Sequence, residues 1–125
     1  MKRKVLEQAL TAAKKDSKSI NRGELKILQA YHNFKRRTWE GGYQTGTEEL
    51  VITGTIEGKE TVSEMAKFFK KAEIETFIFA DSSTALMRTL HTFMTAGFEI
   101  TEPVLIKREG FLGDALEKGL RIRIK

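Results

Sequence analysis

The chain has no cysteine, one proline and one tryptophan among its 125 residues. The lack of cysteine excludes disulfides, thiolate metal sites and a cysteine nucleophile, which fits a reducing compartment, so we expect a cytoplasmic protein. No apolar run approaches the ~20 residues that span a bilayer. Glu7 and Gln8 interrupt the apolar segment that a signal peptide needs behind its basic start. Neither secretion nor a membrane partner is expected.

Histidine is also scarce. His32 and His91 are the only two, and neither is followed by a second histidine or a carboxylate at the three- or four-residue spacing of a helical metal site. The glutamates between residues 48 and 64 are typical of a solvated acidic segment rather than of a general acid and base. We predict no metal, no cofactor and no catalytic residue, and an enzyme is the less favoured class.

The remaining composition describes one self-sufficient domain. Hydrophobic residues make up 40% of the chain and charged residues 31%, the usual balance for a globular protein. A chain of this length buries roughly two thirds of the surface that it exposes when unfolded. We predict a single domain over residues 1–125, in which a glycine-bearing loop joins a basic helical arm at 1–37 to an α/β core at 48–125.

Two helices are expected in the basic helical arm. An apolar stripe runs from Val5 to Ala13 and predicts a first helix that ends before Asp16. Asn21 has the pattern of a helix cap, with Glu24 three residues on as its capping-box partner. The second helix is therefore predicted to start at Asn21.

Two further helices are expected in the core. The capping-box pattern of residues 61–64 predicts the start of a third helix. Ser82 or Ser83 would cap a fourth helix, with Met94 on its inner side and Gly97 as a left-handed terminator.

Four strands complete the predicted fold. Residues 49–57 alternate, with Gly54 as a bulge, and residues 74–80 read as an inner strand covered on both faces. Residues 98–108 and 119–125 would pair as a hairpin. The class is then α+β: two N-terminal helices followed by β-α-β-α-β-β, with a mixed four-stranded sheet.

Part of this core has a familiar pattern. The stretches from Thr61 to Phe69 and from Ile74 to Met87 resemble small uncharacterised proteins of bacterial phages and mobile elements. Those proteins share a helix, a Phe-rich strand and a Ser/Thr-started helix that ends near Gly-Phe. The resemblance covers residues 61–106 and carries no activity and no functional residue. It implies an accessory protein of a mobile element.

The charges are unevenly distributed along the chain. The net charge is +5, but residues 1–37 hold eleven Lys or Arg against three acids, whereas residues 38–103 hold five against eleven. Cationic arrays attract phosphate backbones, and Tyr31, Trp39 and Tyr43 are candidates for stacking on bases. The acidic middle of the chain can also neutralise part of the array within the molecule, and lysine-rich faces serve solubility alone.

The basic helical arm therefore gives the leading hypothesis, a non-enzymatic accessory protein that binds nucleic acid or an acidic protein surface. A homodimer is also left open, with Trp39 as an anchor. The residues predicted to make the contact are Lys14, Lys15, Arg22, Lys35, Arg36, Arg37 and Trp39.

The rival hypothesis is a small-ligand binder or enzyme with an anion site at residues 81–84. Ser82, Ser83 and Thr84 follow a predicted buried strand and open a helix, where free N–H groups and the helix dipole can hold a phosphate or carboxylate. Plain capping requires the same residues. Asp81 would repel an anion, and the segment has no glycine-rich loop.

Overall fold

The computed structural model describes residues 1–35, 43–44, 49–56, 58–81, 83–108 and 115–124. Its helices are α1 (Arg3–Lys15), the short 3-10 helix η1 (Ser17–Ser19), α2 (Arg22–Lys35), α3 (Gly58–Lys71) and α4 (Leu86–Thr95). Its strands are β1 (Tyr43–Gln44), β2 (Val51–Thr53), β3 (Thr76–Ala80), β4 (Glu99–Arg108) and β5 (Ala115–Arg123). The predicted α+β class and the order of its elements are confirmed.

The four predicted strands form a mixed sheet in the order β4-β5-β3-β2, and the two-residue strand β1 is added at the edge beside β4. Strands β2 and β3, which α3 connects, are parallel, as expected for a helical crossover. The β4–β5 hairpin is antiparallel, and β5 also pairs antiparallel with β3. The predicted inner strand, β3, is therefore flanked on both sides.

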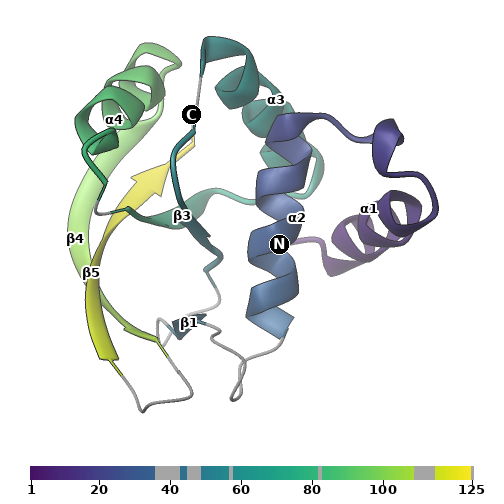
Figure 1. Ribbon diagram of the computed structural model, residues 1–125, viewed down its shortest axis with the longest axis horizontal. Helices are drawn as coiled ribbons and strands as arrows, with labels where there is room; N and C mark the ends of the chain where they lie inside the picture. The colour runs from purple at the N-terminus through teal and green to yellow at the C-terminus, as the bar shows by residue number, and fades with distance from the viewer. Residues whose placement is uncertain (36–42, 45–48, 57, 82, 109–114, 125) are drawn as a thin grey trace.

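Alternation along β3 divides the core in two. Phe77 and Phe79 face a large cluster to which all four α-helices contribute, whereas Ile78 joins a smaller cluster on the opposite face of the sheet. Figure 1 shows α2 between α1 and the sheet, with α4 beside one end of the β4–β5 hairpin. Leu6 of α1 and Ile27 of α2 are fully buried in the large cluster. The helices of the basic helical arm are thus part of the core.

The start of α2 follows the predicted cap. The Asn21 side-chain oxygen accepts the backbone N–H of Glu24 at 2.8 Å. In the first turn of α2, Gly23 lies against α3, and a Cβ atom built on it would lie 2.6 Å from the backbone nitrogen of Met65 and 2.7 Å from the carbonyl oxygen of Thr61. The absence of a side chain at Gly23 is therefore what lets α2 and α3 approach closely.

This close approach explains why the predicted start of α3 was wrong. The helix begins at Gly58, before residues 61–64, and Thr61 is buried within it. The residues of α3 that contact Gly23 are Thr61, Glu64 and Met65, so the capping-box pattern lies inside the helix, where it packs on α2, and does not mark the start of α3. The predicted bulge at Gly54 was also wrong. Gly54 follows the short strand β2 with a φ of 84° and does not lie within a longer strand.

The C-terminal end of α4 was predicted correctly, but its start was not. Gly97 terminates the helix with a φ of 92°, and the N–H of Phe98 donates to the carbonyl of Phe93 at 3.0 Å, as in a Schellman motif. The start lies at Leu86 and not at Ser82 or Ser83, with Ala85 in the cap position.

The prediction that Met94 points inward was wrong, since its side chain is 59% exposed. Phe93 already faces the sheet, and Met94 lies roughly 100° further round the helix.

A polar network on β5 links three elements. Arg121 donates from Nε to Oε2 of Glu49 at 2.9 Å and from Nη2 to Oε1 at 2.8 Å, and it also pairs with Glu102. Thr76 of β3 donates its hydroxyl to Glu49 at 2.9 Å. These contacts, above all the hydrogen bonds with Glu49, raise the pKa of Arg121 further above its usual range. The expected solvated acidic segment therefore contributes a half-buried ion pair.

Arg121→Ala should destabilise the fold by about 2 kcal/mol, between the values for exposed and buried ion pairs. The side chains of Arg121 and Glu49 are only 23% and 13% exposed, so the variant leaves a poorly solvated carboxylate without its bidentate partner. Arg123→Ala is the matched control, because Arg123 lies on the same strand and pairs with Glu99 at the surface. Urea unfolding should separate the two variants, and equal losses would contradict the structural role of the network.

Candidate functional site

Three of the predicted cations, together with Lys18, lie around the junction of α1 and α2. Lys14 and Lys15 occupy the last turn of α1, Lys18 lies in η1, and Arg22 begins α2. All four side chains are exposed. Lys15, Lys18 and Arg22 form no ion pair with a carboxylate in the described part of the chain. We call Lys14, Lys15, Lys18 and Arg22 the cationic corner.

Lys35 lies apart from this corner, in an ion pair within the molecule. Its Nζ is 2.6 Å from Oε1 of Glu7 and 5.5 Å from the centre of the Tyr31 ring. The hydrogen bond from Lys35, followed by the one from Tyr31, lowers the pKa of the Glu7 carboxyl. Lys35 is therefore partly neutralised by its own chain, through an acid of the basic helical arm itself and not through the acidic middle of the chain.

Tyr31 cannot serve as a stacking platform in this fold. It is 2% exposed, and its hydroxyl donates to Glu7 at 2.8 Å. Burial, followed by that hydrogen bond, raises the pKa of its phenol. Of the other predicted contact residues, Arg36, Arg37 and Trp39 lie outside the described residues.

A hollow of about 350 Å³ opens on the outer side of α2, where α1 and β2 border it. Leu10 and Ala13 of α1, Ile20, and Leu25 and Leu28 of α2 supply its apolar wall. Leu25 is 43% exposed. We call this feature the apolar hollow; it could not be predicted from local sequence patterns because it depends on how α1 packs against α2.

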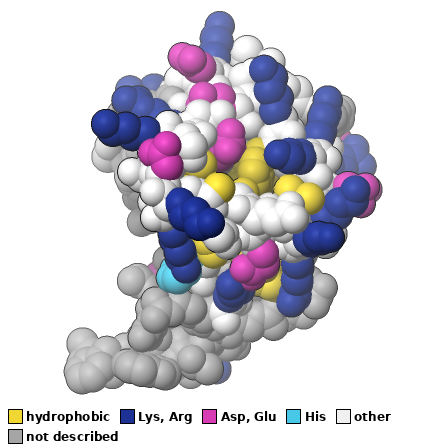
Figure 2. All heavy atoms as spheres, turned by 90° about the vertical axis from the view of Figure 1, so that its right-hand side faces the viewer, with side chains coloured by type: hydrophobic (Ala, Val, Ile, Leu, Met, Phe, Trp, Pro, Cys, Tyr) yellow, Lys and Arg dark blue, Asp and Glu magenta, His cyan; other side chains and the backbone are white. Residues whose placement is uncertain are grey.

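Figure 2 shows the side of the molecule on which α1 lies outermost. Hydrophobic side chains are visible near the middle of this face, with Lys and Arg around them and Asp and Glu side chains between the cations. The face thus combines apolar surface with an excess of positive charge.

The segment predicted as an anion site already carries a carboxylate of its own. The side chain of Asp81 accepts the backbone N–H of Ser83 at 2.9 Å and the Ser83 hydroxyl at 2.8 Å. Because α4 starts only at Leu86, its free N–H groups do not begin at this segment. Ser82 lies outside the described residues, and Thr84 is exposed. The donors of Ser83 are therefore used within the chain, and the anion site stays a prediction that the geometry does not favour.

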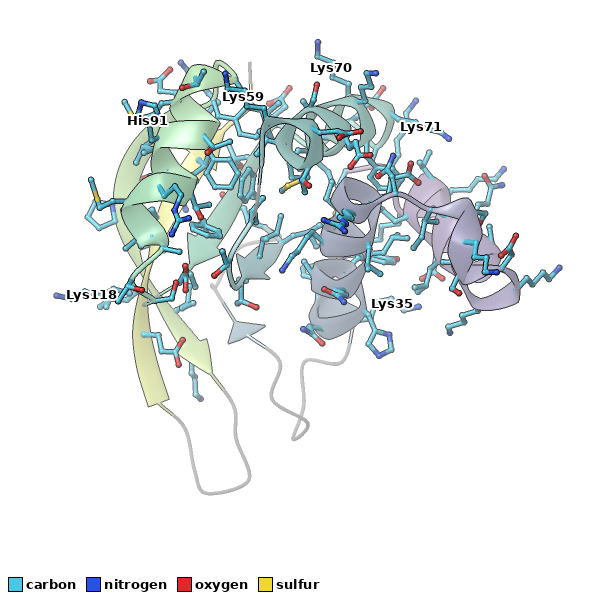
Figure 3. All side chains as sticks on the ribbon, turned by 45° about the horizontal axis from the view of Figure 1, so that its top comes forward. Lys35, Lys59, Lys70, Lys71, His91 and Lys118 are labelled. Carbon is cyan, nitrogen blue, oxygen red and sulfur yellow. The ribbon has the colours of Figure 1, made fainter. Side chains whose placement is uncertain are left out.

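The titratable side chains labelled in Figure 3 lie on different sides of the molecule. In Figure 3, Lys70 and Lys71 of α3 point outward at one end of the molecule, while His91 on α4 and Lys118 on β5 lie on another side. Within the described ranges, no three His, Asp or Glu side chains gather closely enough to hold a metal ion. No helix in the described part of the chain is long and apolar enough to cross a membrane.

The strongest feature on the described surface is therefore the apolar hollow with its neighbouring cations. Comparison of the chain with protein-family models, curated proteins and solved structures gave no match. The resemblance of residues 61–106 to proteins of phages and mobile elements thus stays a prediction.

Proposed function

We propose that the protein acts by binding an acidic surface of a partner protein through the outer side of α1, η1 and α2, and that it catalyses no reaction. The observation that carries this proposal is the apolar hollow beside the cationic corner. Lys15, Lys18 and Arg22 have no described carboxylate to neutralise them, and Leu25 exposes apolar surface between helices. An apolar centre with a polar rim is the usual build of a protein interface.

Nucleic acid is the other target that the cations would attract, and two features favour a protein instead. Binding of single strands relies on exposed aromatic platforms, and Tyr31, the one predicted platform whose side chain the structure describes, is buried. A phosphate backbone has no apolar group to place in the apolar hollow. An acidic protein segment can supply both carboxylates and aliphatic side chains.

Selection of random displayed peptides on the immobilised protein at about 0.15 M salt tests the proposal. We expect the enriched peptides to combine Asp or Glu with large apolar residues. The triple variant Lys15→Glu, Lys18→Glu and Arg22→Glu should lower their affinity at least roughly tenfold, because it replaces attraction by repulsion.

The matched control reverses three exposed lysines of α3, Lys67, Lys70 and Lys71, and so changes the net charge equally. It should change peptide affinity far less. Duplex DNA, measured by fluorescence anisotropy, should bind weakly and lose affinity steeply as salt rises. Selection without acidic enrichment, or tighter binding of DNA than of any selected peptide at the same salt, would overturn the proposal.

A further inference from the structure

A second hollow, of about 390 Å³, adjoins the apolar hollow along α2. Leu25, Lys26 and Gln29 line both, so the two hollows meet at these residues. The second one adds Arg22 and the polar side chain of Thr55, which follows β2. Residues three and four apart share one side of a helix, so α2 presents Arg22, Leu25, Lys26 and Gln29 together. We call the combined feature the α2 groove; it has an apolar end and a cationic end.

The Lys26 ammonium group is held at the cationic end. Its Nζ lies 3.4 Å from the position that a Cβ atom of Gly54 would occupy, and the side chain is half-buried. Neither the Lys26 nor the Arg22 side chain has a hydrogen bond or ion pair to a described residue. They are four residues apart, where two like charges repel each other. A carboxylate placed between them would relieve that repulsion and form charge-assisted hydrogen bonds to both.

We infer that the α2 groove binds an acidic segment of the partner protein, with a Glu or Asp carboxylate between Arg22 and Lys26 and an aliphatic side chain against Leu25. The inference rests on the proposed function and adds the place and chemistry of the contact. The positive charges of Arg22 and Lys26 favour a carboxylate on the partner. The exposed Leu25 favours an apolar partner side chain within about 5 Å of that carboxylate, the rise of one helical turn that separates these residues on α2. A lone inorganic anion would use only the cationic end.

A double-mutant cycle with the most enriched acidic peptide from the selection above tests this geometry. In the protein, the double variant Arg22→Gln and Lys26→Gln removes the charges, and Leu25→Ala removes the apolar contact. In the peptide, the acidic residues are changed one at a time to their amides and the apolar residues one at a time to Ala. We expect the charge-removing variant to weaken the parent peptide roughly tenfold and to have little effect once the matching carboxylate is an amide.

Leu25→Ala should show the same coupling with one aliphatic position of the peptide. The control variant Lys15→Gln and Lys18→Gln removes two charges outside the α2 groove, so it should weaken every acidic peptide by only about twofold and show no preferred partner position. Chemical-shift mapping should confine the larger amide shifts to residues 22–29 and 53–55.

Two outcomes separate the inference from the proposed function. If acidic peptides are enriched but the charge-removing variant of the α2 groove weakens all peptide variants alike, the groove is not the contact, although the protein still binds acidic partners. The same holds if the Lys15 and Lys18 control gives the stronger coupling. If no acidic peptide is enriched, both proposals fail together.

Discussion

Gly23→Ala is expected to destabilise the protein by about 3 kcal/mol, the upper part of the range for an overpacked contact. The added methyl group would lie 2.6 Å from the backbone nitrogen of Met65 and 2.7 Å from the carbonyl oxygen of Thr61, and backbone atoms cannot rotate out of its way. Alanine is favoured over glycine within a helix by only about 1 kcal/mol, so the cost of the collision is larger and the variant is less stable than the parent protein. Urea denaturation followed by circular dichroism measures the loss.

Two controls test this explanation of Gly23. Gly58→Ala meets no atom within 4 Å but has a φ of 83°, so it should cost only about 1 kcal/mol of backbone strain. Glu64→Gly removes the one side-chain atom near the new methyl group and leaves the backbone collision in place. If the double variant Gly23→Ala and Glu64→Gly were as stable as Glu64→Gly alone, the backbone contact would not be the cause.

Phe93→Ala should have the largest effect of any single truncation in α4, about 4 kcal/mol. Phe93 is fully buried, and its ring centre lies 5.7 Å from that of Phe77, 5.2 Å from that of Phe79 and 5.6 Å from that of Phe98. The variant therefore removes the ring at the centre of this aromatic cluster. Since domains of this kind are stable by about 5–15 kcal/mol in total, a large part of the unfolding free energy would be lost.

Met94→Ala is the matched control for Phe93→Ala, because it is the next residue of the same helix. Its side chain is 59% exposed, so its truncation should change the unfolding free energy by less than about 0.5 kcal/mol. A loss comparable to that of Phe93→Ala would mean that Met94 points inward after all, as the sequence pattern predicted.

The parts of the fold that were predicted correctly depend on local chemistry. Asn21 caps α2 through a hydrogen bond to a residue three positions on, and Gly97 ends α4 because its φ is left-handed. The consecutive apolar residues of β3 also predicted a strand covered on both faces. Each of these features can be read from a few neighbouring residues.

The wrong predictions concern features that distant contacts decide. Thr61 lies inside α3, where its carbonyl oxygen packs against Gly23 of α2. Glu49 is half-buried because Arg121, 72 residues away, reaches it from β5. Local patterns do not contain these pairings.

The sequence predicted the positive charge of the candidate site, but it did not predict the hollows beside the cations. Lys14, Lys15 and Arg22 were predicted from the excess of cations, and their exposure agrees with that prediction. Lys35 belongs to the same run of charge, yet its pair with Glu7 depends on the packing of α1 against α2. The α2 groove depends on that packing and on the position of β2, so Lys26 and Leu25 became candidates only in the folded chain.

The position of β5 bears on how the chain is made. This strand is the last in the sequence, but it separates β3 from β4 in the sheet. While residues 115–123 are still in the ribosome, β3 can pair only with β2, and the edges that β5 will join stay open. Open edges beside a Phe-rich strand invite pairing with other nascent chains. We therefore expect the sheet to close only after β5 has emerged from the ribosome.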